Sequence, residues 1–397
     1  MPKVKLLMPI DSTFLSSVIH EGLLYLIKNY SQNFGLEEID FEQNFLSKAY
    51  SQMDEERINK IRIAMAGNDN LNSKLFEKLG SNLKSRKTYY DLLLMLKNNS
   101  SIIKQLIIIE RDPIELGHRI SGKEHLIGIG KKDNGIAAPQ LLKIDRYTGF
   151  TSLETPYTSK QFTLYISPEV ALIYLVGIYS SFVGSIRQQN QNYYFFLFLS
   201  PDEVIKLLYE GNKSLLDAYM KVKNFAMEEL EKVISRYPLN ELMAIELALN
   251  LEIRRLMDSE NLDKLSLLLF KIAPEGQTYK IYETLALEIY RITPFYTIAE
   301  KYFGNAEKFI EKLSHVLAPD KIIMEALSSL SKKNRYSEAE NVLMAIQNLY
   351  RFVMLGDAQG FFGFLQKLDE ARKKLENSKD KREAFRARLY NNIVAMF

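Results

Sequence analysis

The 397-residue sequence contains no cysteine. It therefore has no disulfide bond, no thiolate metal site and no cysteine nucleophile. Only four histidines are present, and their scattered positions form none of the short spacings that bind metal ions. We therefore expect no metal and no other cofactor. The absence of cysteine is also compatible with a reducing cytoplasm.

Long hydrophobic runs are also missing. The longest, at residues 170–183, falls short of the roughly 20 residues that a membrane-spanning helix needs. The apolar run near the N-terminus, Val4–Met8, is too short for a signal peptide, and no small-residue cleavage site follows it. These absences predict a cytoplasmic protein without a membrane partner.

The net charge of the chain is also small, with a formal value of +3. This excludes a histone-like nucleic-acid binder. Basic residues collect at the C-terminus, where residues 366–397 contain nine Lys or Arg against five Asp or Glu. The pattern suits a subunit that touches nucleic acid in places and packs against protein elsewhere.

Hydrophobic periodicity predicts an α+β fold with two domains. Residues 1–210 form a mixed α/β domain with a small sheet, and residues 211–397 form an all-α helical-bundle domain. In the first domain we expect a helix at 12–30 and strands at 3–8, 105–110, 119–120, 125–129, 140–146 and 161–166. After residue 200 we expect helices only, including 239–257, 261–271, 278–291, 336–355, 358–376 and 380–395.

Two strand-to-helix units carry the same local signal, at Leu164–Ser180 and Phe195–Glu210. In each, an apolar run ends in Ser-Pro followed by an acidic residue. The serine can cap the helix, proline fits the first turn, and the acid is favoured by the helix dipole. Glu203, three residues after Ser200, predicts a capping box.

One stretch matches part of a nucleotide-binding motif. Gly117–Glu124 reads G-x-x-x-x-G-K, but Glu124 stands where a P-loop needs a Ser or Thr hydroxyl. The residues that follow are β-branched and glycine-rich, whereas a P-loop opens a helix. We interpret the stretch as a hairpin with its turn at Ser121-Gly122. Together with the absence of a metal or nucleophile cluster, this predicts a protein that is not an enzyme.

Two polar segments are candidates for contacting DNA, Gly128–Gly135 (GIGKKDNG) and Arg187–Asn192 (RQQNQN). Amide, Lys and Arg side chains hydrogen-bond base edges and phosphates. The candidates for reading a base motif are Lys131, Lys132, Asn134, Gln188, Asn190 and Asn192, and Arg187 is a candidate for the DNA backbone. Solvated hairpin turns remain an equal alternative for both segments.

The C-terminal segment offers a third candidate. Four basic residues recur every seven positions, which is about every 10 Å along a helix, provided that the helix continues through Asn377-Ser378. The proposed contacts with the DNA backbone are Lys367, Lys374, Lys381 and Arg388, flanked by Arg382 and Arg386. Such a row can follow phosphates, and a solvated bundle face is the alternative. The aromatic run Tyr193–Phe198 predicts core packing rather than base stacking.

The segment LLKIDRYTGFTSLETPYTSKQFTLYISPEVALIYLVGIYSSF (Leu141–Phe182), followed by YYFFLFLSPDEVIKLL, resembles the large subunit of type I-A CRISPR interference complexes (archaeal Cascade). The closing REAFRARLYNNIVAMF is similar to the end of that family's helical bundle.

The resemblance implies a non-catalytic role. The N-terminal domain would grip the guide-RNA complex and read the protospacer-adjacent motif on double-stranded target DNA. The helical domain would line the path of the displaced strand and help recruit a helicase–nuclease. The implied partners also include the guide RNA and the backbone and small subunits of the complex.

Two other functions remain open at this point. A stand-alone nuclease with an unrecognised site would need a cluster of Asp, Glu, His and Lys residues that the sequence does not reveal. A scaffold subunit that binds only protein would show negligible duplex binding that does not depend on salt.

Overall fold

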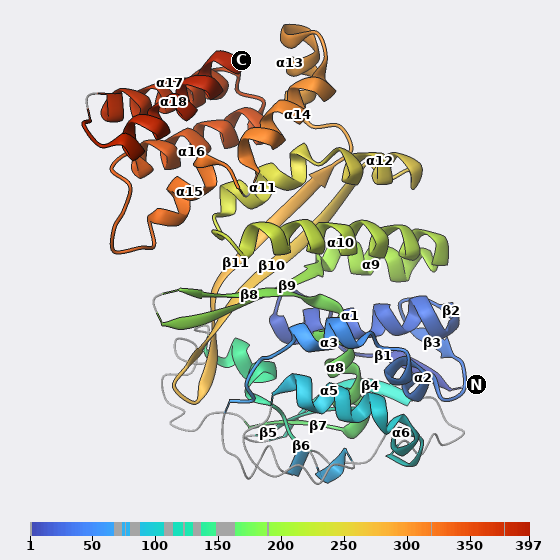
Figure 1. Cartoon of the computed structure of the whole chain (residues 1–397). Helices are drawn as coiled ribbons and strands as arrows, with labels where there is room; N and C mark the ends of the chain where they lie inside the picture. Colours follow the sequence, from blue (N-terminus) through green and yellow to red (C-terminus); the bar gives the residue numbers. More distant parts are fainter. Residues whose placement is uncertain are drawn as a thin grey trace. The chain divides into compact units, whose positions relative to one another are not determined.

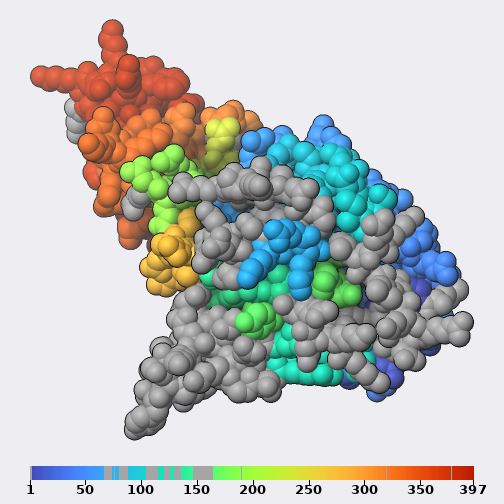
Figure 2. All heavy atoms as spheres, turned by 90° about the horizontal axis from the view of Figure 1, so that it is seen from below, coloured from blue at the N-terminus to red at the C-terminus, as the bar shows by residue number. Residues whose placement is uncertain are grey.

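The computed structural model describes residues 2–66, 74–75, 77–79, 88–106, 114–121, 124–129, 136–147, 163–188, 190–318, 320–376 and 378–397 (coloured in Figures 1 and 2). The chain forms two compact units. Unit 1 consists of Met1–Gly184, Gln191–Tyr219 and Ser266–Ala286. Unit 2 consists of Ser185–Asn190, Met220–Leu265 and Leu287–Phe397.

Unit 1 contains a mixed seven-stranded sheet of order β2-β3-β1-β4-β5-β7-β6. Strand β1 runs parallel to β4, and β5 runs parallel to β7, while the pairs β1–β3, β2–β3, β4–β5 and β6–β7 are antiparallel. The strands are β1 (Lys3–Leu6), β2 (Ser31–Phe34), β3 (Glu38–Phe41), β4 (Ile114–Ser121), β5 (Glu124–Ile129), β6 (Ile136–Ala137) and β7 (Thr163–Ile166). The sheet confirms the strands expected near 3–8, 119–120, 125–129 and 161–166.

Helices accompany this sheet in unit 1 (Figure 1). They are α1 (Phe14–Tyr30), α2 (Phe45–Ser51), α3 (Glu55–Lys60), α5 (Tyr89–Asn98), α6 (Ser100–Leu106), the 3₁₀ helix η1 (Gln140–Tyr147) and α8 (Pro168–Ser181). The strand expected at 140–146 is therefore wrong, because these residues form η1. Of the strand expected at 105–110, residues 105–106 end α6, and the others lie outside the described residues.

The two central helices of unit 1, α1 and α8, cross at a pair of glycines. A Cβ atom on Gly22 would lie 2.1 Å from the carbonyl oxygen of Ile173, and one on Gly177 would lie 1.9 Å from that of Val18. Real Cβ atoms do not approach backbone oxygens so closely. The absence of a side chain at both positions therefore allows the helices to pack backbone against backbone.

This crossing predicts a destabilised Gly177→Ala variant. The added methyl group must push α8 away from α1, which is expected to lower the free energy of unfolding by about 1–3 kcal/mol or more. Urea unfolding followed by circular dichroism measures the loss. Gly128→Ala is the control, because a Cβ atom at Gly128 meets no atom within 4 Å. Equal stability of the two variants would contradict the close crossing.

A second sheet has the strand order β11-β10-β9-β8. Its strands are β8 (Phe182–Gln188), β9 (Gln191–Leu199), β10 (Lys264–Glu275) and β11 (Thr278–Tyr290). Antiparallel pairing of β9 with β10 runs from Leu199 opposite Leu267 to Tyr194 opposite Ile272. In unit 1, one face of this sheet packs on α1, where the Phe14 ring lies 5.3–5.6 Å from the rings of Phe196, Phe198 and Phe270.

The β10–β11 hairpin contradicts the helices expected at 261–271 and 278–291. Burial alternates along β11 with the two-residue period of a strand, and Gly276 adopts the positive φ of +61° in the connection. Residues after 210 are therefore not all helical, and the inner part of the hairpin belongs to unit 1. The fold class is confirmed: a mixed α/β N-terminal part followed by a C-terminal helical region.

The Ser-Pro signals form the expected helix starts. The Ser167 hydroxyl accepts a hydrogen bond from the Val170 amide (3.3 Å), and the Ser200 hydroxyl accepts one from the Glu203 amide (3.5 Å). The capping box is wrong. The Ser200 amide donates instead to the Ser266 carbonyl, and the Glu203 carboxylate accepts from the Ser266 amide at 3.1 Å. Glu203 therefore ties α9 (Pro201–Glu210) to β10.

Unit 2 is mainly helical, and α10 (Lys213–Ile234) begins in unit 1 and continues into it. The other helices are α11 (Asn240–Leu249), α12 (Leu251–Ser259), α13 (Pro294–Phe303), α14 (Ala306–Leu317), α15 (Ile322–Ser329), α16 (Ala339–Leu355), α17 (Ala358–Glu376) and α18 (Lys381–Met396). Helices α16, α17 and α18 pack in sequence, as expected for a bundle (Figure 1). Among the described helices, none has the length and apolar character needed to cross a membrane.

Candidate nucleic-acid interface

The polar segment Arg187–Asn192 forms the tip of the β8–β9 hairpin. Arg187, Asn190 and Asn192 are exposed, and Gln188 is half-buried. Asn190 adopts a left-handed φ of +66°, a conformation that asparagine tolerates in hairpin turns. The turn therefore gives Asn190 a backbone role in addition to any contact with a base.

Strand alternation divides the residues after this turn between the two faces of the sheet. Gln191 and Tyr193 lie on one face, and Asn192 and Tyr194 lie on the other. Burial raises the pKa of Tyr194, and the Asn192 side chain partly opposes this shift. Asn192 therefore faces a different surface from Gln191 and Tyr193.

An aromatic and basic group lies on the Tyr193 face within unit 1. The Tyr193 and Tyr282 rings meet edge to face, with centroids 5.4 Å apart and planes at 85°. The Lys271 ammonium nitrogen lies 4.8 Å from the centroid of the Tyr193 ring. We call Gln191, Tyr193, Lys271 and Tyr282 the sheet-face cluster.

Gln191 holds this cluster together. Its Nε2 donates to the Tyr282 hydroxyl oxygen at 2.8 Å and to the Pro274 carbonyl at 3.2 Å. Its Oε1 accepts from the Tyr193 hydroxyl at 3.3 Å. One amide therefore fixes both tyrosines, while 43% of Tyr282 remains exposed. The cluster can present a π face and a positive charge to solvent.

Sequence reasoning missed this cluster. Lys271 and Tyr282 fall in the segments expected to be helices, and Tyr193 was expected in the core but is half-buried. The rest of its run, Tyr194–Phe198, is buried as predicted. The signal that could have revealed the cluster is the alternation of Lys280, Tyr282 and Thr284 with apolar Ile281 and Leu285, which has the two-residue period of a strand.

Most of the first polar segment, Gly128–Gly135, lies outside the described residues. Strand β5 ends at Ile129 and β6 begins at Ile136, and Lys131, Lys132 and Asn134 lie outside the described residues. Their proposed role in reading bases stays a prediction. The earlier stretch Gly117–Ser121 lies on β4, and Ser121 pairs opposite Glu124 of β5, as expected for a hairpin rather than a P-loop.

The C-terminal basic residues do not form one continuous row. Helix α17 ends at Glu376, and α18 begins at Lys381 after Asp380, whose carboxylate accepts from the Arg382 amide at 2.7 Å. This cap starts a new helix, α18, which packs against α17. The four basic residues therefore do not lie along one helix axis. Lys374, Lys381, Arg382 and Arg388 are exposed. Lys367 is half-buried and pairs with Glu370 at 2.7 Å.

Arg386 has an internal contact instead of a free guanidinium. Its Nε and Nη2 donate to the two carboxylate oxygens of Glu338 at 2.7 and 3.2 Å, and its side chain is 13% exposed. Glu338 is fully buried, and the Tyr336 ring lies 4.0 Å from the Arg386 guanidinium carbon. The structure therefore assigns Arg386 to the bundle interior rather than to the DNA backbone.

Asp145 of η1 stabilises the start of α1. The Phe14 and Leu15 amides donate to the Asp145 carboxylate of η1, each at 2.9 Å. Burial raises the pKa of Asp145, and the two amides oppose this shift. Asp145 therefore has an architectural role, because it supplies acceptors for amides that a helix start leaves free.

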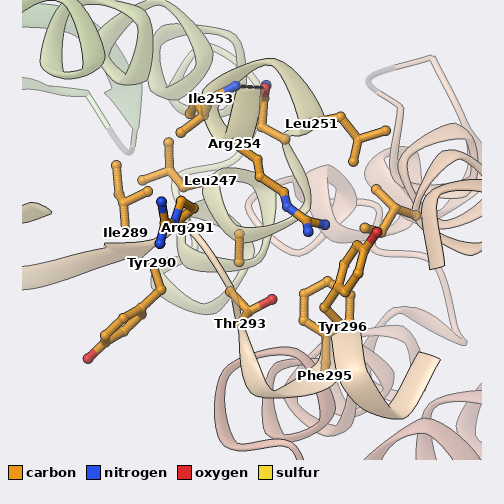
Figure 3. Close-up of a pocket in the computed structure, with 13 residues that line it drawn as sticks. Leu247, Leu251, Ile253, Arg254, Ile289, Tyr290, Arg291, Thr293, Phe295 and Tyr296 are labelled. Carbon is orange, nitrogen blue, oxygen red and sulfur yellow. Dashed lines mark hydrogen bonds between the residues drawn. The ribbon is translucent and has the colours of Figure 1, made fainter. Parts of the chain in front are cut away.

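Described residues of unit 2 line two cavities that differ in size. The first, of about 10 Å³, has space for roughly one water molecule. In it the Arg254 guanidinium carbon lies 3.5 Å from the centroid of the Tyr296 ring (Figure 3). The second, of about 420 Å³, is lined by Glu246, Glu252 and Glu311. The acidic lining of the second cavity disfavours phosphates, and the first cavity is too small for a nucleotide. Neither cavity is therefore a candidate for nucleic acid.

The described residues contain no group of three or more His, Asp or Glu residues that could hold a metal ion. No family model matches the sequence, and no solved structure matches it. An uncharacterized protein of Archaeoglobus fulgidus is 53% identical over 395 residues, which cover 99% of this chain and 99% of that protein.

Proposed function

The chain belongs to the family of this Archaeoglobus fulgidus protein, and we propose that it is the non-catalytic large subunit of a type I-A CRISPR interference complex. The proposal rests on the resemblance of Leu141–Phe182 and the segments that follow it. The observation that carries it is the exposed β8–β9 hairpin, which offers the guanidinium of Arg187 and the amides of Asn190 and Asn192. These groups can hydrogen-bond phosphates and base edges.

In this proposal the subunit reads a short protospacer-adjacent motif on double-stranded target DNA, while pairing with the guide RNA selects the sequence. Its partners are the guide RNA, the backbone and small subunits, and the helicase–nuclease that cleaves the target. The helical region lines the path of the displaced strand. The chain acts in the cytoplasm and needs no cofactor of its own.

Co-purification from the native host tests the proposal. A tagged full-length chain is expected to bring down a guide RNA and several copies of a backbone subunit. The same tag on an unrelated cytoplasmic protein is the control. Recovery of the chain without RNA and without a repeated subunit would contradict the proposed assembly.

A prediction for motif reading concerns the six candidate residues of the two polar segments. Gln188→Ala, Asn192→Ala, Asn190→Gly and alanine at Lys131, Lys132 and Asn134 are compared on targets with and without the motif. Glycine is used at Asn190 because it keeps the left-handed turn. Substitution of a residue that reads a base is expected to weaken DNA binding by about 1–3 kcal/mol, and only for targets that carry the motif. If the variant with all six substitutions distinguishes targets with and without the motif as well as wild type does, other residues read the motif.

A further inference from the structure

We propose that the sheet-face cluster binds an unpaired nucleic-acid strand by stacking a base on Tyr282, beside Tyr193. This inference rests on the proposed nucleic-acid role and deepens it, because it names an unpaired strand as the ligand of this face. The six side chains that are proposed to read a duplex do not belong to this cluster.

The geometry of the two rings suits stacking. In an edge-to-face pair, one ring directs its edge at its neighbour, so that a ring face is left for a further aromatic group. Tyr282, which is 43% exposed, can offer such a face to solvent. Stacking of a base on an exposed aromatic ring contributes about 1–3 kcal/mol for each base.

The rings are also held in place before any ligand arrives. Gln191 bonds to both tyrosine hydroxyl groups and anchors to the Pro274 carbonyl. Binding a strand therefore costs less side-chain entropy than it would on freely rotating rings. This preorganisation distinguishes the cluster from an exposed tyrosine whose ring has no hydrogen bond to hold it in place.

The charges of this face favour an anionic ligand. Lys271 contacts the Tyr193 ring, and no carboxylate partner of its ammonium group occurs among the described residues. Lys280, which shares a face with Tyr282 by strand alternation, pairs with Glu275 at 3.5 Å. Both members of that pair are exposed, so the pair is weak and Lys280 remains accessible. A basic peptide would be repelled by Lys271, whereas phosphates are attracted.

The need for a free base face argues for an unpaired strand. In a duplex each base is covered above and below by its neighbours, so a protein ring has no access to it. In a single strand the bases can splay and stack on the protein. Both the guide RNA and displaced DNA provide such a strand, and they share this chemistry.

Tryptophan fluorescence gives a direct test, because the sequence contains no tryptophan. The full-length Tyr282→Trp variant is titrated with 15-nucleotide oligo(dT) or oligo(U), a length of about one binding site. Base stacking is expected to quench its fluorescence. Tyr209→Trp is the control, since Tyr209 is 79% exposed on α9 and lies outside the cluster; its fluorescence should remain unchanged.

Affinity is measured in parallel by anisotropy of fluorescein-labelled strands. Tyr282→Leu removes the π system and is expected to weaken binding roughly 5- to 150-fold, which is the conversion of one stacked base. Tyr282→Phe keeps the ring but loses the hydrogen bond from Gln191, so its affinity should lie between those of wild type and Tyr282→Leu. A duplex of equal length should bind Tyr282→Leu and wild type alike. Comparison of the DNA and RNA strands identifies the source of the ligand.

Three results would overturn the inference: no binding of either strand by wild type, unchanged affinity of Tyr282→Leu, or no quenching of Tyr282→Trp at saturation. Capture of a protein segment by this face, without any strand, would overturn it as well. Failure of the wild-type chain to co-purify with guide RNA and backbone subunits would contradict the proposed complex and leave the stacking measurements standing.

Discussion

Arg386→Ala is expected to lower the free energy of unfolding by about 3–5 kcal/mol, the cost of removing one partner of a buried ion pair. The variant leaves the fully buried Glu338 carboxylate without its two guanidinium hydrogen bonds. It also removes the packing of Arg386 on the Tyr336 ring. Urea unfolding of the full-length chain, followed by circular dichroism, measures the loss.

Arg388→Ala is the matched control for this variant. Arg388 lies two residues further along α18 and is exposed, so its loss should change stability by no more than about 0.5 kcal/mol. Arg386→Lys should recover only part of the stability, because an ammonium group lacks the planar fork that bonds both carboxylate oxygens. Equal small losses for Arg386→Ala and Arg388→Ala would show that the pair is not a structural contact.

Glu246→Gln is expected to make the chain more stable in mildly alkaline solution. Burial, with a contribution from the neighbouring Glu229 charge, raises the pKa of Glu246 to about 7, and Lys232 partly opposes this shift. Since the ordinary pKa is 4.5, the folded protein binds the proton more tightly than the unfolded chain does. Stability is therefore lost as the pH rises from about 4.5 through about 7, by up to about 3 kcal/mol.

The glutamine variant imitates the protonated acid at every pH. Its gain over wild type should therefore be close to zero near about pH 4.5 and should reach up to about 3 kcal/mol above about pH 7. Thermal and urea unfolding at several pH values measure this difference. Glu252→Gln is the control, because Glu252 lines the same cavity but is exposed. Parallel stability curves for wild type and Glu246→Gln would contradict a raised pKa of the Glu246 carboxyl group.

The basic residues of the C-terminus illustrate why a charge pattern needs a structure. Lys374, Lys381, Arg382 and Arg388 keep exposed side chains, and their contact with nucleic acid stays a prediction. Arg386 carries the same charge and lies among them in the sequence, yet its partner Glu338 is 48 residues away. A pairing over that distance leaves no periodic signal, so sequence spacing could not separate the structural arginine from the exposed ones.

The sequence alone determined the features that depend on neighbouring residues. These include the helix starts at Ser167 and Ser200, the helix α1, the last three helices and the hairpin β4–β5. Each depends on caps, turns or periodicity within a few residues, and those interactions are already encoded in the local order of side chains. The polar tip at Arg187–Asn192 belongs to the same class.

Only the tertiary structure decided the β10–β11 hairpin and the sheet-face cluster. The run Lys264–Glu275 is apolar on both faces and fits a buried helix or a central strand, and pairing with β9 selected the strand. That pairing brings Gln191 within 2.8 Å of the Tyr282 hydroxyl across 91 residues of chain. Strand β10 also explains why the capping box does not form. The Ser200 amide and the Glu203 carboxylate, which would bond to each other in a capping box, bond instead to the backbone of Ser266 on β10. Local propensity does not distinguish a helix from a strand in this run, and the hydrogen bonds to a strand distant in sequence select the strand.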